Sequence, residues 1–222
     1  PIARSRNLSS SGYAILQRGN GPDATWLCVK YGPHGGGHGH FDKNHFVLRS
    51  GRRWLVSDPG THLYGSDLHR DWDRTSLAHT TLTADEQPQA AATGRCLAWG
   101  TSGGADYVVT DAGAIYPGLR FVRAVALLDT NWVVIADHVS ADRPLLLDLA
   151  VHIPGTWKSE QESRPWSPPN APGYRRLRDA VLSEPRNRAA ISIQGEGQHL
   201  VHLRAASTEP FEVIRANGIG RS

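Results

Sequence analysis

The amino-acid sequence predicts an all-β fold, an antiparallel β-sandwich in a single domain over residues 5–210. Short runs rich in β-branched and aromatic residues recur along the whole chain, and Gly, Pro, Asn or Asp bounds them, as is typical of strands. No amphipathic helix of about 10–15 residues alternates with these runs, which argues against the crossover helices of a parallel sheet. Many short strands separated by frequent turns favour a sandwich.

The strands are expected, in chain order, at residues 13–16, 25–30, 45–48, 54–56, 77–81, 107–110, 121–128, 132–136, 145–152, 189–194 and 199–204. Hairpin turns are expected at residues 50–51, 103–104 and 129–131, because Gly, Asn and Asp adopt the backbone angles that tight turns need. Residues 164–173 contain four prolines, and proline does not fit a central strand. This segment is therefore expected to be a long surface loop.

The composition is that of a globular protein. The chain has 222 residues, of which 39% are hydrophobic and 20% charged, and this balance excludes wholesale disorder. The formal net charge of +3 is too small to indicate nucleic-acid binding, and no apolar run approaches the roughly 18 residues of a transmembrane helix. Neither nucleic acid nor a membrane is therefore an expected partner.

Two features of the composition concern processing and redox state. The chain contains no Met and opens on Pro1, so we expect a processed chain or a piece of a longer protein. Cys28 and Cys96 lie far apart in apolar runs and are expected to be small core residues. A disulfide between them is an alternative that the sequence leaves open.

Histidine is concentrated in one window of the sequence. Seven of the 11 histidines fall between His34 and His79, and we expect the function to reside there. In its glycine-rich part, His38 and His40 are two residues apart, so both imidazoles would project from one face of an extended segment. Two imidazoles on one face can begin a metal site or a proton-transfer site. The alternative is a flexible loop with solvated histidines.

Two further residues extend this pattern. Asp58 follows a strand at an Asp-Pro-Gly turn, and His79 adds another imidazole in the expected strand 77–81. Two imidazoles and one carboxylate suit Zn²⁺ or a similar divalent ion, with one coordination position left open. Taken singly, each residue also has a structural interpretation, Asp58 as the cap of its turn and His79 as a packed strand histidine.

The histidine-rich run belongs to a larger set of motifs. It reads Tyr-Gly-Pro-His-Gly-Gly-Gly-His-Gly-His-Phe-Asp-Lys over residues 31–43, and Asp-Pro-Gly-Thr at 58–61, Tyr-Gly-Ser at 64–66 and Ala-His-Thr at 78–80 follow. With segments 123–125, 133–139 and 151–154, this set resembles the C-terminal β-sandwich domain of heparinase II/III-like polysaccharide lyases. That family includes heparin and heparan lyases and exo-acting oligoalginate lyases, and the wording of the first motif is closest to the alginate branch.

The resemblance implies roles for five residues. In the family, the second His of His-Gly-His, the Asp of Asp-Pro-Gly and the His of the Ala-His motif bind a structural Zn²⁺, which points here to His40, Asp58 and His79. The first His of the pair and a tyrosine between the Asp and the last His line the substrate cleft, which points to His38 and Tyr64.

The resemblance also implies a substrate and a partner domain. Family members carry an N-terminal helical toroid that supplies the main catalytic Asn, His and Tyr, and these 222 residues do not include it. We expect the C-terminal domain of a lyase, periplasmic or secreted with the cytoplasm as the alternative, that cleaves an anionic 4-linked uronic-acid polysaccharide by β-elimination. A non-catalytic carbohydrate-binding or scaffolding module is the second hypothesis, and a cupin-like metal oxygenase is the third.

Overall fold

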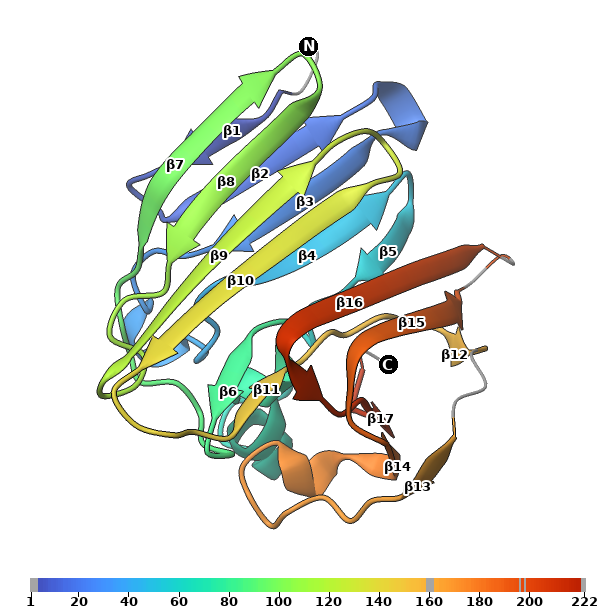
Figure 1. The fold of residues 1–222 in the computed structure, drawn as a ribbon. Helices are drawn as coiled ribbons and strands as arrows, with labels where there is room; N and C mark the ends of the chain where they lie inside the picture. The colour runs from blue at the N-terminus through green and yellow to red at the C-terminus, as the bar shows by residue number, and fades with distance from the viewer. Residues whose placement is uncertain (1–3, 159–161, 196, 198, 221–222) are drawn as a thin grey trace.

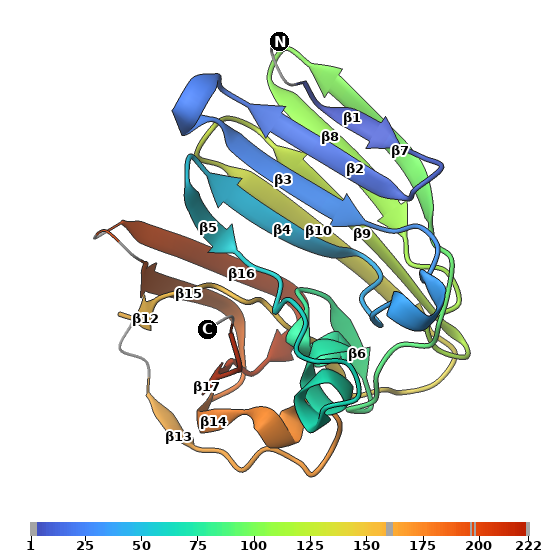
Figure 2. The same cartoon turned by 180° about the vertical axis from the view of Figure 1, so that it is seen from behind.

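The computed structural model describes residues 4–158, 162–195, 197 and 199–220. Its larger part is a sandwich of two antiparallel sheets, which lie one over the other in Figures 1 and 2. The five-stranded sheet has the order β1-β2-β3-β4-β5 and consists of β1 (Arg6–Leu8), β2 (Tyr13–Arg18), β3 (Thr25–Lys30), β4 (His45–Ser50) and β5 (Arg53–Val56). The four-stranded sheet has the order β10-β9-β8-β7 and consists of β7 (Arg95–Ser102), β8 (Ala105–Asp111), β9 (Leu119–Leu127) and β10 (Val133–Ala141). The predicted all-β sandwich is confirmed.

Alternation of apolar residues along the strands builds the core between the two sheets. Leu27 and Val29 of β3 are buried on the inner face of one sheet, and Val125 and Leu127 of β9 on the inner face of the other. These side chains belong to one packed cluster with residues of β2, β4, β5 and β8. The three expected hairpin turns are confirmed, since they join β4 to β5, β7 to β8 and β9 to β10.

Smaller sheets lie beside the sandwich (Figure 1). Two of them have the orders β12-β15-β16 and β13-β14-β17, and β6 pairs with β11. Their bounds are β6 (Leu82–Ala84), β11 (Leu147–Leu149), β12 (Thr156–Trp157), β13 (Ser163–Pro165), β14 (Arg178–Ser183), β15 (Arg186–Gln194), β16 (Leu200–Phe211) and β17 (Ile214–Asn217). The described helical elements are short turns, namely η1 (Gly21–Asp23), η2 (Gly36–His38), η3 (His69–Asp73), η4 (Ser76–Ala78) and η5 (Tyr174–Arg176). None of the described helical turns has the length or apolar character needed to cross a bilayer.

The structure corrects three expectations about local structure. The expected strand 77–81 is wrong, because Ser76–Ala78 forms the 3₁₀ turn η4 and the strand begins only at Leu82. The expected strand 145–152 is limited to Leu147–Leu149. Residues 164–173 are not wholly a surface loop, because the segment begins in edge strand β13 and places Ala171 in a buried cluster with Leu77 and Tyr174. In each case packing against distant residues overrides the local sequence pattern. The domain limits 5–210 stay a prediction.

The two cysteines are both free, and each is partly buried. Burial raises the pKa of the Cys28 thiol to about 11 and also raises the pKa of Cys96. Both are therefore protonated thiols near neutral pH, and the disulfide alternative is not formed.

A buried arginine connects the sandwich to the loops at one end of it. Arg123 on β9 is 2% exposed and donates from Nε and Nη2 to the two carboxylate oxygens of Asp137, at 2.7 and 2.8 Å. Its Nη1 donates to the backbone oxygens of Asn44 and Thr80, at 2.8 and 2.7 Å. The guanidinium also lies 5.2 Å from the centroid of the Phe121 ring. Arg123 therefore fixes two loops against the sheet at once.

Replacing Arg123 by Ala leaves the Asp137 carboxylate and two carbonyl oxygens without their donor. We expect Arg123→Ala to lower the free energy of unfolding by about 3–5 kcal/mol, the usual effect of removing one partner of a buried ion pair. Denaturant unfolding measures this. Arg143→Ala is the matched control, because Arg143 forms an exposed pair with Asp85, and its effect should stay below about 1 kcal/mol. Equal effects of the two substitutions would contradict this assignment.

Candidate functional site

The site lies where the loops of the histidine window meet at the end of the five-stranded sheet. His40 and Asp42 lie between η2 and β4, Asp58 follows β5, and His79 follows η4. Asn44, just before β4, has a φ of +60°. This angle is uncommon for a residue other than glycine, and the Arg123 hydrogen bond holds the residue in place. The loops are therefore shaped by contacts with the sandwich as well as by their own sequence.

His79 is the centre of the group. The side chain is fully buried, and Nδ1 lies 2.8 Å from the backbone oxygen of Thr75, to which it donates. This hydrogen bond leaves the lone pair of the neutral imidazole on Nε2, which is the arrangement of many metal-binding histidines. Nε2 lies 3.2 Å from Nδ1 of His40. Two histidine nitrogens therefore converge on one point.

Two carboxylates face the same nitrogen. Oδ2 of Asp42 lies 3.9 Å from Nε2 of His79, and Oδ2 of Asp58 lies 3.7 Å from it. His40, Asp42 and His79 form a group whose potential ligand atoms all lie within 4.8 Å of one another. A lone pair facing two carboxylates is repelled unless a cation lies between them, so the arrangement favours a bound cation.

The two carboxylates differ in their other partners. Asp42 is 3% exposed, and its Oδ2 also lies 2.7 Å from Nζ of Lys30, while Oδ1 is buried with no hydrogen-bond partner among the described residues. Asp58 accepts a hydrogen bond from the backbone N–H of Gly60 at 2.7 Å. Asp42 is thus already paired with a fixed cation, whereas Asp58 is oriented by a neutral donor.

His45 lies next to the Asp58 carboxylate and helps to orient it. The backbone N–H of Thr80 donates to Nδ1 of His45 at 2.9 Å, so the proton of the neutral ring resides on Nε2. That nitrogen lies 3.3 Å from Oδ2 of Asp58. His45 therefore supports the carboxylate, a role that the sequence reasoning did not assign to it.

The protonation states suit a metal. Burial lowers the pKa values of both His40 and His79 below the usual range of histidine. Burial alone would raise the pKa of Asp58, but the nearby His45 ring and the hydrogen bond from the Gly60 backbone N–H hold it well below its usual value. Burial would likewise raise the pKa of Asp42, but the Lys30 ammonium, 2.7 Å away, holds it below its usual value. Neutral imidazoles beside ionised carboxylates are the forms that bind divalent ions.

The structure therefore brings His40 and His79 of the expected metal set into contact and places Asp58 3.7 Å from His79, but the group of mutually close ligand atoms contains Asp42 in place of Asp58. The sequence contained a signal for Asp42, since it lies two residues after His40 in the same motif. Two imidazole nitrogens and a carboxylate oxygen match the preferences of Zn²⁺, and the unpartnered oxygen of Asp42 indicates unused ligand capacity. The residues present thus fit a zinc ion.

His38 and Tyr64 meet beside this group. Nδ1 of His38 lies 3.0 Å from the hydroxyl of Tyr64, and the rings are edge to face. The expected common face of His38 and His40 on an extended segment is wrong, because His38 ends the 3₁₀ turn η2. A Cβ at Gly39 would lie 1.9 Å from the backbone oxygen of His34, so only glycine fits between the two histidines. Tyr64 is 56% exposed, which leaves it accessible to a ligand.

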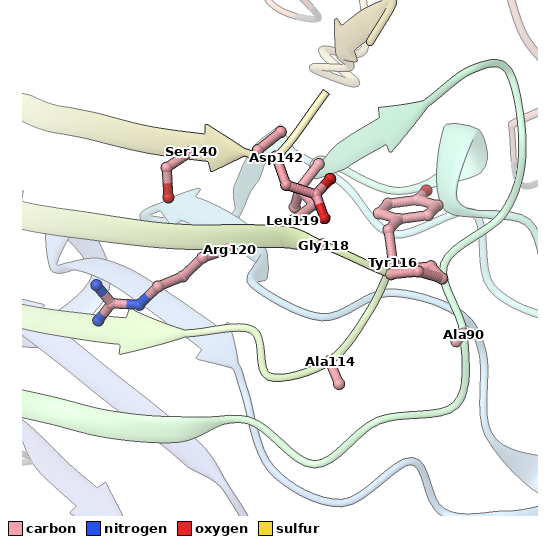
Figure 3. A pocket seen from close by; sticks show the side chains of 10 residues that line it. Ala90, Ala114, Tyr116, Gly118, Leu119, Arg120, Ser140 and Asp142 are labelled. Atoms are coloured by element: carbon pink, nitrogen blue, oxygen red, sulfur yellow. The ribbon is translucent and has the colours of Figure 1, made fainter. Parts of the chain in front are cut away.

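A separate hollow of about 670 Å³ lies at the ends of β9 and β10 (Figure 3). Tyr116, Arg120, Ser140 and Asp142 are among the residues that line it. It shares no lining residue with the histidine group, and Arg120 is already paired with Asp111 at 3.2 Å. The hollow is therefore distinct from the histidine group.

Comparisons with known proteins give consistent matches. Residues 2–216 match the family model described as heparinase II/III-like, C-terminal. The chain is 28% identical over 169 residues to a heparin-sulfate lyase of Pedobacter heparinus, covering 74% of the chain and 25% of the relative. It is 31% identical over 214 residues to an alginate lyase of Stenotrophomonas maltophilia, covering 80% of the chain and 28% of the relative. The chain spans about a quarter of the length of these relatives.

Solved structures agree on the fold. A heparinase III, the BT4657 gene product, superposes with a TM-score of 0.68 at 20% identity, covering 96% of this chain and 35% of that one. The heparan sulfate lyase HepC of Pedobacter heparinus superposes with a TM-score of 0.65 at 19% identity, covering 96% of this chain and 36% of that one. At this identity the superpositions support the fold alone.

His152, which is hydrogen-bonded to Leu77 near the site, predicts how the stability of the fold depends on pH. Nε2 of His152 donates to the backbone oxygen of Leu77 at 2.7 Å, and burial lowers the pKa of His152 to about 4. The unfolded state therefore binds a proton between pH 6.5 and 4 that the folded state does not, and stability falls as the pH falls through this window. The loss attributable to His152 is at most about 3 kcal/mol.

Denaturant unfolding of the protein and of His152→Gln at several pH values measures this loss. The stability difference between the two should shrink as the pH falls from 6.5 to 4. His138→Gln, which changes an exposed histidine on β10, should give a curve parallel to that of the unmodified protein. A parallel curve for His152→Gln would contradict the assignment.

Proposed function

The chain belongs to the heparinase II/III-like family as its C-terminal domain, and on that premise we propose that it is the β-sandwich part of a polysaccharide lyase. The substrate class is a 4-linked uronic-acid polysaccharide or oligosaccharide of alginate or heparin type, cleaved by β-elimination. Curated relatives named as heparin-sulfate and alginate lyases support this class. The observation that carries the proposal is an accessible His38–Tyr64 pair beside a buried group of imidazoles and carboxylates.

The reaction defines what such a pair can do. Elimination requires a base that takes the proton from C5, donors that stabilise the charge developing on the uronate carboxylate, and an acid that protonates the departing O4. The hydroxyl of Tyr64 and Nδ1 of His38 are 3.0 Å apart, so a proton can pass between them along a hydrogen bond. We assign the pair to the substrate side of the cleft, opposite a helical toroid that supplies the main catalytic Asn, His and Tyr.

The proposed ligands of a structural Zn²⁺ are His40, Asp58 and His79. Asp58 is preferred over Asp42 because the Lys30 ammonium already neutralises the Asp42 carboxylate and so weakens its attraction for a second cation. When bound, Zn²⁺ would neutralise buried negative charge and anchor three loops. The neighbouring chain residues keep the ligands in place, with Thr75 holding His79 and with Gly60 and His45 holding Asp58.

Metal analysis of the purified protein tests the ligand set. We expect stoichiometric zinc in the protein and its loss in His40→Ala and His79→Ala, because each removes a nitrogen ligand. Asp58→Asn should lower zinc affinity by 10-fold or more, and Asp42→Asn should lower it less. His138→Ala, at an exposed position on β10, is the control and should retain the metal. Full zinc content in His40→Ala would contradict the metal site, and a larger loss in Asp42→Asn would move the carboxylate ligand to Asp42.

Turnover measurements test the proposed activity. In the protein that carries both this domain and the toroid, His38→Ala and Tyr64→Phe should lower turnover by roughly 10²–10⁴-fold, the scale of a positioned acid–base group. Zinc content and thermal stability should change little. The measurement is the ultraviolet absorbance of the unsaturated uronate product on alginate and on heparan-type chains.

The same assay distinguishes catalysis from binding alone. Residues 1–222 without the toroid should show no appreciable elimination, because the main base lies in the toroid. Near-normal turnover of His38→Ala and Tyr64→Phe would contradict the proposed division of roles. Binding of uronic-acid polymers without any turnover by the two-domain protein would instead support a non-catalytic carbohydrate-binding module.

A further inference from the structure

A second cluster of titratable side chains lies beside Tyr64 and has no part in the roles assigned above. Its centre is Asp73, the last residue of η3, whose side chain is completely buried. One carboxylate oxygen accepts a hydrogen bond from the backbone N–H of His62 at 2.5 Å, and the other lies 2.9 Å from Nδ1 of the same histidine. A buried carboxylate thus holds His62 through both its backbone and its ring.

The same carboxylate faces a second histidine. Nδ1 of His69 lies 3.6 Å from Asp73 and 3.2 Å from the hydroxyl of Thr61. The His69 ring packs edge to face against Tyr64, with centroids 4.7 Å apart. Through His69, Asp73 is therefore linked to Thr61 and to Tyr64, the first and last residues of the short segment 61–64.

The contacts of His62 determine its chemistry. Because Nδ1 donates its proton to Asp73, Nε2 of the neutral ring carries a lone pair and can only accept a hydrogen bond. The His62 side chain remains 31% exposed although Asp73 is fully buried, so the accessible part of the ring is the part away from Asp73. Leu63, the next residue, is 83% exposed. The segment therefore exposes a fixed acceptor, an apolar side chain and the Tyr64 ring in three consecutive residues.

We propose that His62 and Asp73 form a further saccharide-binding element at the rim of the cleft, in which Nε2 of His62 accepts a hydrogen bond from a sugar hydroxyl. Asp73 is a positioning residue, since it fixes the ring and keeps the proton on Nδ1. Hydroxyl groups are abundant on uronic-acid polymers, and a fixed acceptor selects a hydroxyl over a carboxylate, which cannot donate when ionised. This assignment rests on the proposed lyase function.

The tautomer of His62 is the first test and does not depend on catalysis. In the ¹⁵N-histidine-labelled protein, long-range ¹H–¹⁵N correlations should show the His62 proton on Nδ1, and Asp73→Asn should shift it toward Nε2. Asp71→Asn is the matched control on the same helical turn, because Asp71 pairs with Arg176 outside this cluster, at 3.0 Å. A proton on Nε2 in the unmodified protein would overturn the proposal.

Kinetics of the two-domain protein are the second test. Loss of one neutral hydrogen bond weakens binding by about 3- to 10-fold, so His62→Ala and Asp73→Asn should raise KM by this factor. Turnover at saturating substrate should stay within about twofold, because no proton transfer passes through His62. His62→Gln, whose side-chain amide oxygen can occupy the position of Nε2, should restore part of the affinity, and Asp71→Asn should behave like the unmodified protein.

The outcomes separate this inference from the proposed function. An unchanged KM in His62→Ala, in a protein that turns over normally, would overturn the saccharide contact and leave the lyase assignment intact. A fall in turnover and thermal stability in Asp73→Asn, with normal kinetics of His62→Ala, would overturn it in favour of a purely structural clamp. Absence of turnover in the unmodified protein, on every uronic-acid polymer, would overturn the lyase function and the saccharide role with it.

Discussion

A guanidinium buried between aromatic rings joins the sandwich core to the loops of the candidate metal site. Arg123 donates to the carbonyl oxygens of Asn44 and Thr80, and these residues are next in sequence to His45 and His79. A buried carbonyl without a donor costs about 1–3 kcal/mol, so neither loop can move away from the sheet freely. The positions of two imidazoles are therefore set by a strand that contributes no ligand itself.

Three polar side chains at the candidate metal site, those of His79, His45 and Asp58, are oriented by contacts with the backbone. The Thr75 carbonyl holds the His79 ring, the Thr80 amide holds the His45 ring, and the Gly60 amide holds the Asp58 carboxylate. Backbone partners cannot rotate away, so the lone pairs of the imidazoles and the charges of the carboxylates point at one another before any ion binds. A cation at this point would relieve the electrostatic repulsion between these groups.

In the loop after β5, some side chains contact histidines of the interior and others are exposed to solvent. Asp58 and Asp73 are turned inward, toward histidines that pack in the interior. Leu63 and Tyr64, between them, are largely exposed. The partly buried Asp58 and the fully buried Asp73 thus hold both ends of a segment whose middle is exposed, and a segment fixed in this way loses less entropy on binding a ligand.

The sequence by itself determined the fold class and the hairpin turns, and it predicted His40, Asp58 and His79 as candidate metal ligands. Period-two alternation specifies which strand face is buried, and Gly, Asn and Asp specify turns, so these features are local. The His-Gly-His and Asp-Pro-Gly motifs made His40 and Asp58 candidate ligands because imidazole and carboxylate groups are visible in the residue types. Only the tertiary structure decided that residues 77–81 are not a strand, since Leu77 packs with Ala171 and Tyr174, nearly a hundred residues away. It also decided which groups surround Asp42, His45 and Asp73, because the partners of a carboxylate or an imidazole are brought together only by long-range packing.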